Sequence, residues 1–201
     1  MSEVQNARAR NLRTVGLLAA IYLVPLALAF LAYYGTGWRP AGHVNHGTLI
    51  TPPRPLPSLT LPQAAAAGGG ANASPLTFRG PWTLVYIGAG ACDADCEHAL
   101  LVMRQTRLGL NYNMPRVARV FLVTGGCCER ALAAADPGLV VVDASGAAAA
   151  PLLDEFPAAG REHALFIVDP LGNLMMSYDA RSNPHGLLED LEKLLRLSHI
   201  G

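Results

Sequence analysis

The sequence predicts an α/β domain that follows one N-terminal apolar helix. From Leu76 onward, short apolar runs alternate with segments of helical periodicity, which is the pattern of an α/β domain. Before that point, an uncharged run of twenty residues at 15–34 has the length of a membrane-spanning helix. With 201 residues, of which 51% are hydrophobic and 15% charged, the chain has room for one domain, the apolar helix and a linker.

The apolar run at 15–34 is expected to be a transmembrane helix. Three arginines lie just before it: Arg8, Arg10 and Arg13. Basic residues flank the cytoplasmic end of a membrane helix, so residues 1–14 should be cytoplasmic and everything after Tyr34 should lie across the membrane, in the periplasm if the cell is bacterial. The alternative is a signal peptide cleaved at Ala27-Leu28-Ala29. We favour an uncleaved anchor, because cleavage there would leave the apolar end FLAYY exposed.

Residues 35–75 are expected to be a tether. They contain the run PPRPLP at 52–57, which favours extended polyproline-type backbone, and the flexible run AAAAGGGANA at 64–73. His43 and His46 lie in this segment without a cysteine nearby, and we expect their side chains to be solvated. The folded domain is therefore expected to begin only after this segment.

The domain at 76–201 is predicted to alternate strands and helices. Its predicted strands are the apolar runs at 82–87, 117–124, 139–143, 164–168 and 174–178. Short helices are expected at 129–135 and 148–156. The turn Asp169-Pro170-Leu171-Gly172 should join the last two strands as a hairpin. The final helix has its own start signal, with Asn183 as cap and Pro184 at the first helical position.

The first predicted strand of the domain runs into small residues, two cysteines and the start of a helix. Gly88 and Gly90 allow a tight turn at this point. Cys92 follows in the turn, and Asp95 can cap a helix that has Cys96 in its first turn. A helix N-terminus favours thiolate over thiol and so lowers a cysteine pKa. The segment therefore predicts a reactive site that contains two sulfurs.

The three-residue spacer between the cysteines favours a metal ion over a disulfide. Residues four apart on a helix have Cβ atoms roughly 5–6 Å from each other, whereas a disulfide needs about 3.8 Å. Asp93, Asp95 and Glu97 add negative charge around the sulfurs, which suits a cation. A redox-active pair is the second interpretation, and a structural disulfide or two buried thiols is the third.

Two segments of the domain resemble the Sco/SenC family of copper-binding cytochrome c oxidase assembly proteins. FRGPWTLVYIGAGACDADC at 78–96 is similar to that family's strand and cysteine loop, and REHALFIVDPLGN at 161–173 is similar to its histidine segment. The resemblance implies a thioredoxin-like fold behind one membrane anchor. It also implies that Cys92, Cys96 and His163 hold copper, and that Cys92 and Cys96 are the reactive pair of any thiol chemistry.

The sequence departs from this family in two places. Asp93 and Glu97 stand where the family usually has a proline after each cysteine, and Thr124-Gly125-Gly126-Cys127-Cys128 replaces an acidic motif. The chain therefore resembles a divergent member. Cys127 and Cys128 are open to three interpretations: resolving thiols, accessory copper ligands, or two small residues without a special role.

Two thiolates and one imidazole form a soft donor set that suits Cu(I) and also holds Cu(II). Zinc is the competing metal, although a structural zinc site normally takes four protein ligands. The first hypothesis is a membrane-anchored metallochaperone that delivers copper to the copper-bearing subunit of cytochrome c oxidase, a client that the resemblance implies. The second is a thiol-disulfide reductase that keeps the client's copper-ligand cysteines reduced. The third is a thioredoxin-like module without metal or redox chemistry.

The charge of the chain argues against nucleic acid as a partner. The sequence holds 15 Lys and Arg and 15 Asp and Glu, which gives a formal net charge of zero. The basic residues are not gathered into a long run that could follow a phosphate backbone. We therefore expect the membrane and a protein client as partners, and no nucleic acid.

Overall fold

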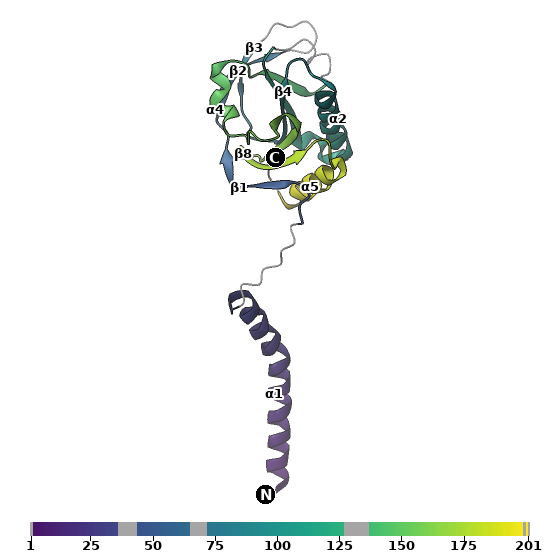
Figure 1. Cartoon of the computed structure of the whole chain (residues 1–201). Coiled ribbons are helices and arrows are strands. Elements are labelled where there is room, and N and C mark those ends of the chain that lie inside the picture. Colours follow the sequence, from purple (N-terminus) through teal and green to yellow (C-terminus); the bar gives the residue numbers. More distant parts are fainter. Residues whose placement is uncertain (1, 36–43, 65–71, 127–136, 199, 201) are drawn as a thin grey trace. The chain divides into compact units, whose positions relative to one another are not determined.

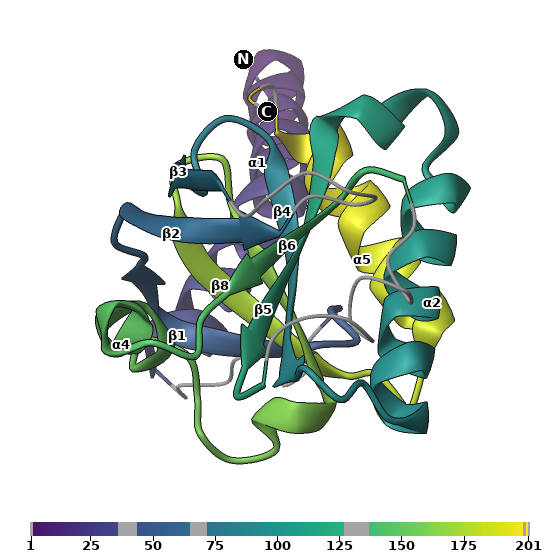
Figure 2. The ribbon, with the colours of Figure 1, turned by 90° about the horizontal axis from the view of Figure 1, so that it is seen from above.

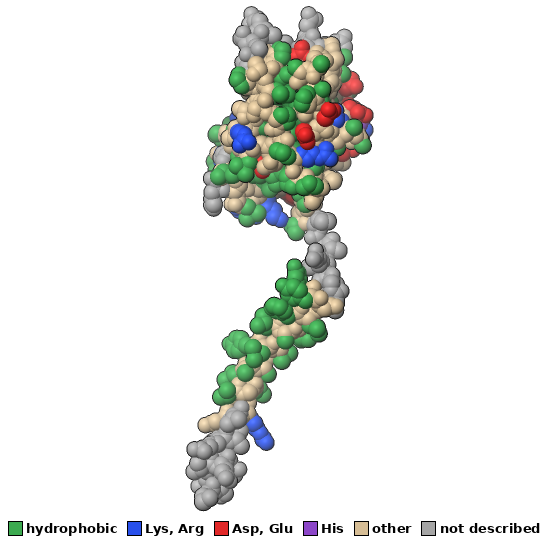
Figure 3. Space-filling view, turned by 90° about the vertical axis from the view of Figure 1, so that its left-hand side faces the viewer, with side chains coloured by type: hydrophobic (Ala, Val, Ile, Leu, Met, Phe, Trp, Pro, Cys, Tyr) green, Lys and Arg blue, Asp and Glu red, His purple; other side chains and the backbone are tan. Residues whose placement is uncertain are grey.

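The computed structural model describes residues 2–35, 44–64, 72–126, 137–198 and 200, which fall into two compact units, Met1–Val44 and Asn45–Gly201. The first unit is helix α1 (Ser2–Phe30), which continues into a π-helical turn at Leu31–Gly35 (Figure 1). Its described apolar side chains are exposed, and they cover the face seen in Figure 3. The stretch Arg13–Gly35 is long and apolar enough to cross a membrane, as an anchor or as a signal sequence.

The second unit is built on one eight-stranded mixed sheet with the order β1-β8-β7-β4-β5-β6-β2-β3. In chain order its strands are β1 (Thr48–Pro55), β2 (Leu59–Ala64), β3 (Asn72–Leu76), β4 (Trp82–Ala89), β5 (Val117–Thr124), β6 (Leu139–Asp143), β7 (Ala164–Val168) and β8 (Asn173–Asp179). The neighbours β4, β5 and β6 are parallel, and β7 and β8 continue the sheet antiparallel beyond β4. All five strands that the sequence predicts after residue 76 are present, and β7 and β8 form the expected hairpin.

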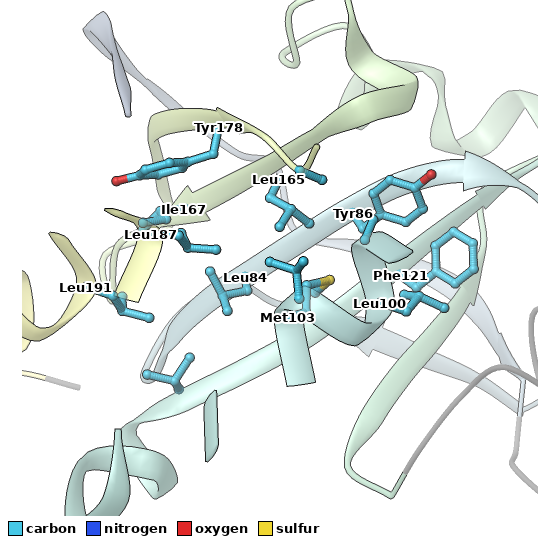
Figure 4. Close-up of a cluster of buried hydrophobic side chains, with 14 of the residues drawn as sticks. Leu84, Tyr86, Leu100, Met103, Phe121, Leu165, Ile167, Tyr178, Leu187 and Leu191 are labelled. Atoms are coloured by element: carbon cyan, nitrogen blue, oxygen red, sulfur yellow. The ribbon is translucent and has the colours of Figure 1, made fainter. Parts of the chain in front are cut away.

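Helices α2 (Ala94–Gly109) and α5 (Pro184–Leu197) lie side by side on one face of the sheet (Figure 2). Side chains alternate along β4, so Leu84 and Tyr86 face these helices and meet Met103 there (Figure 4). Their neighbours Val85 and Ile87 belong to a second cluster on the opposite face of the sheet. The central strand is therefore buried on both faces, which explains its nearly continuous apolar sequence.

The second face is covered by α4 (Ala150–Leu153), which follows a 3₁₀ turn at Ala147–Ala149. This helix is shorter than the predicted 148–156, because beyond Leu153 the backbone N–H groups of Glu155 and Phe156 donate to the carbonyls three residues back, of Leu152 (3.3 Å) and Leu153 (3.2 Å), as in a tighter turn. The start of α5 agrees with its prediction: Pro184 is the first helical residue, and the Asn183 side chain accepts a hydrogen bond from the backbone N–H of Gly186 (3.0 Å). The predicted helix at 129–135 lies outside the described residues.

The prediction of a tether over 35–75 is wrong for most of its length. β1 pairs antiparallel with β8 and β2 pairs with β6, so this segment supplies three strands of the sheet. Leu61 of β2 is 2% exposed and belongs to the cluster on the second face. The proline-rich run is compatible with β1 because β1 is an edge strand, where a missing backbone N–H leaves no partner unpaired. The folded unit therefore begins near Asn45.

The start of this unit is fastened to α5 through the buried carboxylate of Asp190. Its Oδ2 accepts hydrogen bonds from the backbone N–H groups of His46 (2.6 Å) and Gly47 (3.1 Å) and from the hydroxyl of Tyr178 (2.7 Å). Burial raises the pKa of Asp190, but the donors outweigh burial and hold that pKa below its ordinary value. His46 is exposed, as expected, although its ring nitrogen Nδ1 also lies 3.3 Å from Oδ1 of Asp190. His43 lies outside the described residues.

Candidate metal and redox site

A tight turn after β4 carries Cys92. The backbone N–H of Cys92 donates to the carbonyl of Ala89 (3.1 Å), and Cys92 itself has φ = +36°, a left-handed conformation that is uncommon outside glycine. Gly88 is needed for a different reason, because a Cβ there would lie 2.8 Å from the ring of Tyr86. The turn therefore depends on one unusual backbone conformation and one close approach between backbone and ring.

Helix α2 begins directly after this turn, and its cap is Asp93. The Oδ1 atom of Asp93 accepts a hydrogen bond from the backbone N–H of Cys96 (3.1 Å). The sequence-based assignment of the cap to Asp95 is wrong, because the helix starts at Ala94 and so takes the residue before it as cap. Cys96 does lie in the first turn, as predicted. The carboxylate of Asp95 is therefore not used as the helix cap.

Cys92 and Cys96 form a disulfide, with Cα atoms 5.1 Å apart. The sequence predicts Cys92 in the turn before the helix and Cys96 in its first turn, but the estimated Cβ separation assumed helical geometry between them, for which a disulfide would need local rearrangement. In the structure, Cys92 precedes the cap and adopts left-handed backbone, which supplies that rearrangement. Both residues are buried, with 6% and 2% exposure. A disulfide and a metal ion are thus alternative states for the same two sulfurs.

His163 reaches this site from the end of a 3₁₀ turn at Arg161–His163, immediately before β7. Its backbone N–H donates to the carbonyl of Gly160 (3.1 Å), and its carbonyl accepts from the N–H of Ala180 (2.8 Å). The Tyr86 hydroxyl donates to the carbonyl of Glu162 (2.9 Å) and so ties the turn to β4. The position of His163 is therefore fixed by backbone contacts on both sides of the residue.

The cysteine pair and His163 line one cavity of about 140 Å³. Tyr86, Asp93, Asp95 and Glu162 also line it. The Nδ1 atom of His163 is buried and lies 3.3 Å from Oδ2 of Asp95, yet it has no hydrogen-bond partner of good geometry. The structure thus brings His163 next to the two cysteines, from which it is 67 or more positions away along the chain.

Negative charge dominates this cavity. The pKa of Tyr86 is raised to about 12, first by burial and then by the charges of Asp93, Asp95 and Glu162. The same carboxylates oppose ionisation of a nearby thiol and attract a cation. The electrostatic surroundings therefore favour a metal ion at the sulfurs over free, reactive thiolates.

In the disulfide state, no group of three or more Cys, His, Asp or Glu among the described residues is arranged to hold a metal ion. Two of the predicted donors are joined to each other, so reduction must free their sulfurs first. Cys127 and Cys128 lie outside the described residues. The roles of Tyr86 and Glu162 were not predicted, because a tyrosine inside an apolar strand and a glutamate in a polar loop carry no motif in the sequence.

Comparison with known proteins adds a family and a fold. Residues 82–198, more than half of the chain, match the family model described as "Transmembrane-like, thioredoxin-like, C-terminal domain". No curated protein sequence matches the chain. The family match covers the sheet from β4 onward together with α2 and α5, and it therefore includes every residue of the candidate site.

Solved structures of Sco proteins are similar in fold at low sequence identity. Apo Sco1 from Thermus thermophilus has a TM-score of 0.55 and 18% identity, over 79% of this chain and all (100%) of that one. Copper-bound ScoI from Bradyrhizobium japonicum has a TM-score of 0.51 and 14% identity, over 68% and 97%. BsSco, a Sco-family cytochrome c oxidase assembly protein with a disulfide switch, has a TM-score of 0.51 and 12% identity, over 77% and 99%.

These low identities show a common fold alone. The predicted α/β, thioredoxin-like domain with one N-terminal apolar helix is confirmed by the family match and by the structural similarity. The likeness to Sco/SenC proteins holds for the structure at low identity. The chain belongs to the family of transmembrane-like, thioredoxin-like C-terminal domains.

Proposed function

We propose that the protein is a membrane-anchored copper-binding assembly factor that delivers copper to cytochrome c oxidase. The observation that carries the proposal is that Cys92, Cys96 and His163 line the same cavity at the start of α2. Reduction of the disulfide releases two sulfurs next to an imidazole. Sulfur and imidazole donors suit copper in both oxidation states, whereas magnesium and calcium require oxygen ligands.

The residues around the sulfurs fit a bound cation. Asp93, Asp95 and Glu162 line the cavity, and their negative charge attracts a cation toward the sulfurs. The buried Nδ1 atom of His163 has no hydrogen-bond partner of good geometry, so it is available as a metal donor. Copper here is a cargo, and the chain's own part is to bind it, shield it and release it.

The client and the compartment rest on similarity and on the N-terminal helix. Copper is bound in ScoI of Bradyrhizobium japonicum, and BsSco belongs to a family of oxidase assembly proteins. As an anchor, α1 would keep the N-terminus cytoplasmic and place the second unit in the periplasm of a bacterial cell, because the arginines precede the apolar run. There the unit would face the copper-bearing subunit of the oxidase.

A thiol-disulfide reductase is the second candidate, and the closed disulfide between Cys92 and Cys96 favours it. In that reaction the reduced pair passes two electrons to a client disulfide, whose sulfurs become thiols while Cys92 and Cys96 close their own bond. Two features disfavour it as the main role. The carboxylates oppose thiolate formation, and His163 occupies the position before β7 where thioredoxin-type enzymes commonly have a substrate-holding proline.

The test of delivery uses cells that lack this chain. Cells that also express the wild type should regain copper in purified cytochrome c oxidase, and cells that express Cys92→Ser or His163→Ala should not. An alkaline phosphatase fused after Gly201 should be active if the second unit is periplasmic. Full copper content of the oxidase without the chain would contradict the proposal. Reduction of insulin disulfides at the rate of a thioredoxin, unchanged in His163→Ala, would favour the reductase instead.

A further inference from the structure

Asp95 lines the cavity, and unlike Asp93 its carboxylate does not cap helix α2. It lies in the first turn of α2, its side chain is half exposed (50%), and its Oδ2 lies 3.3 Å from Nδ1 of His163. We propose that Asp95 is a fourth metal ligand, which completes a set of two sulfurs, one nitrogen and one oxygen. This inference rests on the proposed function, because it assumes that the reduced site binds metal.

The distance between the two side chains is that of two ligands on one ion. Metal bonds of about 2.0–2.1 Å to nitrogen and oxygen, at a tetrahedral angle, place the two donor atoms roughly 3.3–3.4 Å apart. Oδ2 of Asp95 and Nδ1 of His163 are separated by 3.3 Å. The buried Nδ1 makes no hydrogen bond of good geometry with that oxygen, so binding one ion to both atoms would break no hydrogen bond.

The other carboxylates near the site are less suited to this role. Oδ1 of Asp93 accepts the hydrogen bond that caps α2. If Asp93 bound a metal ion through this oxygen, the helix would lose its cap. Glu162 lies 3.9 Å from Nε2, the opposite ring nitrogen, and its side chain is 70% exposed. Glu97 follows Cys96 but does not line the cavity. Asp95 is therefore the oxygen donor that the structure places beside the buried nitrogen.

An oxygen ligand changes which metals the site prefers. Cu(I) depends on soft donors, so two thiolates and an imidazole already satisfy it. Zn(II) takes four ligands and accepts a carboxylate oxygen, and Cu(II) also accepts oxygen and nitrogen donors. We expect Asp95 to strengthen the binding of divalent ions and to contribute little to Cu(I). The chain would thus hold oxidised copper, and zinc, more firmly than three ligands would.

The test compares Asp95→Asn with Asp93→Asn in the reduced full-length chain, purified in detergent. Both variants remove one negative charge from the same helix start, and asparagine remains a good helix cap at position 93. Zinc is the first probe because it cannot oxidise the thiols, and affinity is measured by competition with a chelator. Cu(I) affinity is measured in parallel without oxygen. The absorption spectrum of bound Co(II) reports whether the ion has four ligands.

We expect Asp95→Asn to weaken zinc binding by about tenfold or more relative to Asp93→Asn. Its Cu(I) affinity should stay within about threefold of the wild type, because the soft donors remain. Equal zinc affinities in the two variants, or an unchanged Co(II) spectrum in Asp95→Asn, would overturn the assignment of Asp95 and leave the proposed function intact. A reduced wild type that binds neither zinc nor copper would instead overturn the proposed function itself, and Asp95 with it.

Discussion

His163 contributes a nitrogen donor whose position is set by its backbone. Its N–H and carbonyl bond to Gly160 and Ala180, and neither bond involves the ring. Removal of the ring should therefore alter the metal site without unfolding the turn that carries it. This separation makes His163 the residue whose substitution is easiest to interpret.

We expect His163→Ala to weaken Cu(II) binding by about tenfold or more and Cu(I) binding much less, because the soft thiolates on which Cu(I) mainly depends remain. Binding is measured by competition titration of the reduced chain without oxygen, and the Cu(II) form by electron paramagnetic resonance. His98→Ala is the matched control, since His98 is exposed on α2 and does not line the cavity. Identical Cu(II) spectra for both variants and the wild type would exclude His163 as a ligand.

The site was largely predictable at the level of residue identity and less so at the level of geometry. Cys92 and Cys96 could be named from the sequence, because a strand, a glycine turn and a helix start have recognisable patterns. His163 could be named only from the resemblance of residues 161–173 to the histidine segment of the Sco/SenC family. The cap on Asp93 and the contact of Asp95 with His163 could not, because each depends on where the helix begins to within one residue. The left-handed backbone at Cys92, which allows the disulfide, also has no sequence signal.

At the scale of elements, the contact between the chain before β1 and helix α5 depends on Asp190. Three hydrogen-bond donors meet one carboxylate oxygen, and two of them are backbone groups that side-chain substitution cannot remove. Loss of the carboxylate charge would weaken all three bonds together. This contact therefore holds the chain immediately before β1 against α5.

We expect Asp190→Asn to lower the free energy of unfolding at pH 7 by about 1–3 kcal/mol, because buried donors lose a charged acceptor. The folded pKa of Asp190 lies below its unfolded value, so its contribution is present above about pH 4 and is lost as the pH falls through the folded pKa. Urea unfolding between pH 2 and pH 7 measures both effects. Glu192→Gln, exposed on the same helix, is the control. An equal acid sensitivity of the wild type and Asp190→Asn would contradict this role.

The elements that could be predicted are those with a regular apolar pattern. β4 to β8 and α5 have such patterns, and the structure contains each of them close to its predicted bounds. Strands β1, β2 and β3 could not be predicted, because their segment is rich in proline, alanine and glycine, a composition typical of linkers. Only the structure shows that the segment adds strands at the edges of the sheet. Their pairing is also remote in sequence. Paired residues of β2 and β6 are more than 75 positions apart, and those of β1 and β8 are more than 100 positions apart.

At the scale of the whole molecule, the boundary of the folded unit decides which fragment can be studied. Both apolar clusters lie within Asn45–Gly201, and one of them includes Leu61 of β2. A fragment that starts at residue 76 would expose the edges of β8 and β6 and remove Leu61 from the core. We therefore expect a fragment of residues 45–201 to fold and one of residues 76–201 to be much less stable.

Thermal unfolding followed by circular dichroism measures this difference. The longer fragment should show one cooperative transition, and the shorter one should show a transition at least about 10 °C lower or none, because it loses several kcal/mol of apolar burial and sheet pairing. The full-length chain in detergent serves as the reference for the folded spectrum. Midpoints that agree within about 2 °C would mean that β1 and β2 are dispensable for the fold.

The central claim is that the reduced chain binds copper through the sulfurs of Cys92 and Cys96 and the imidazole of His163. The full-length chain is reduced in detergent, loaded with Cu(I) without oxygen and washed with a competing chelator, and its copper is then counted by elemental analysis. We expect about one copper ion per chain for the wild type and almost none for the Cys92→Ser/Cys96→Ser double variant, because Cu(I) depends on soft thiolate donors. Full loading of the double variant, or a reduced wild type without copper, would contradict the claim.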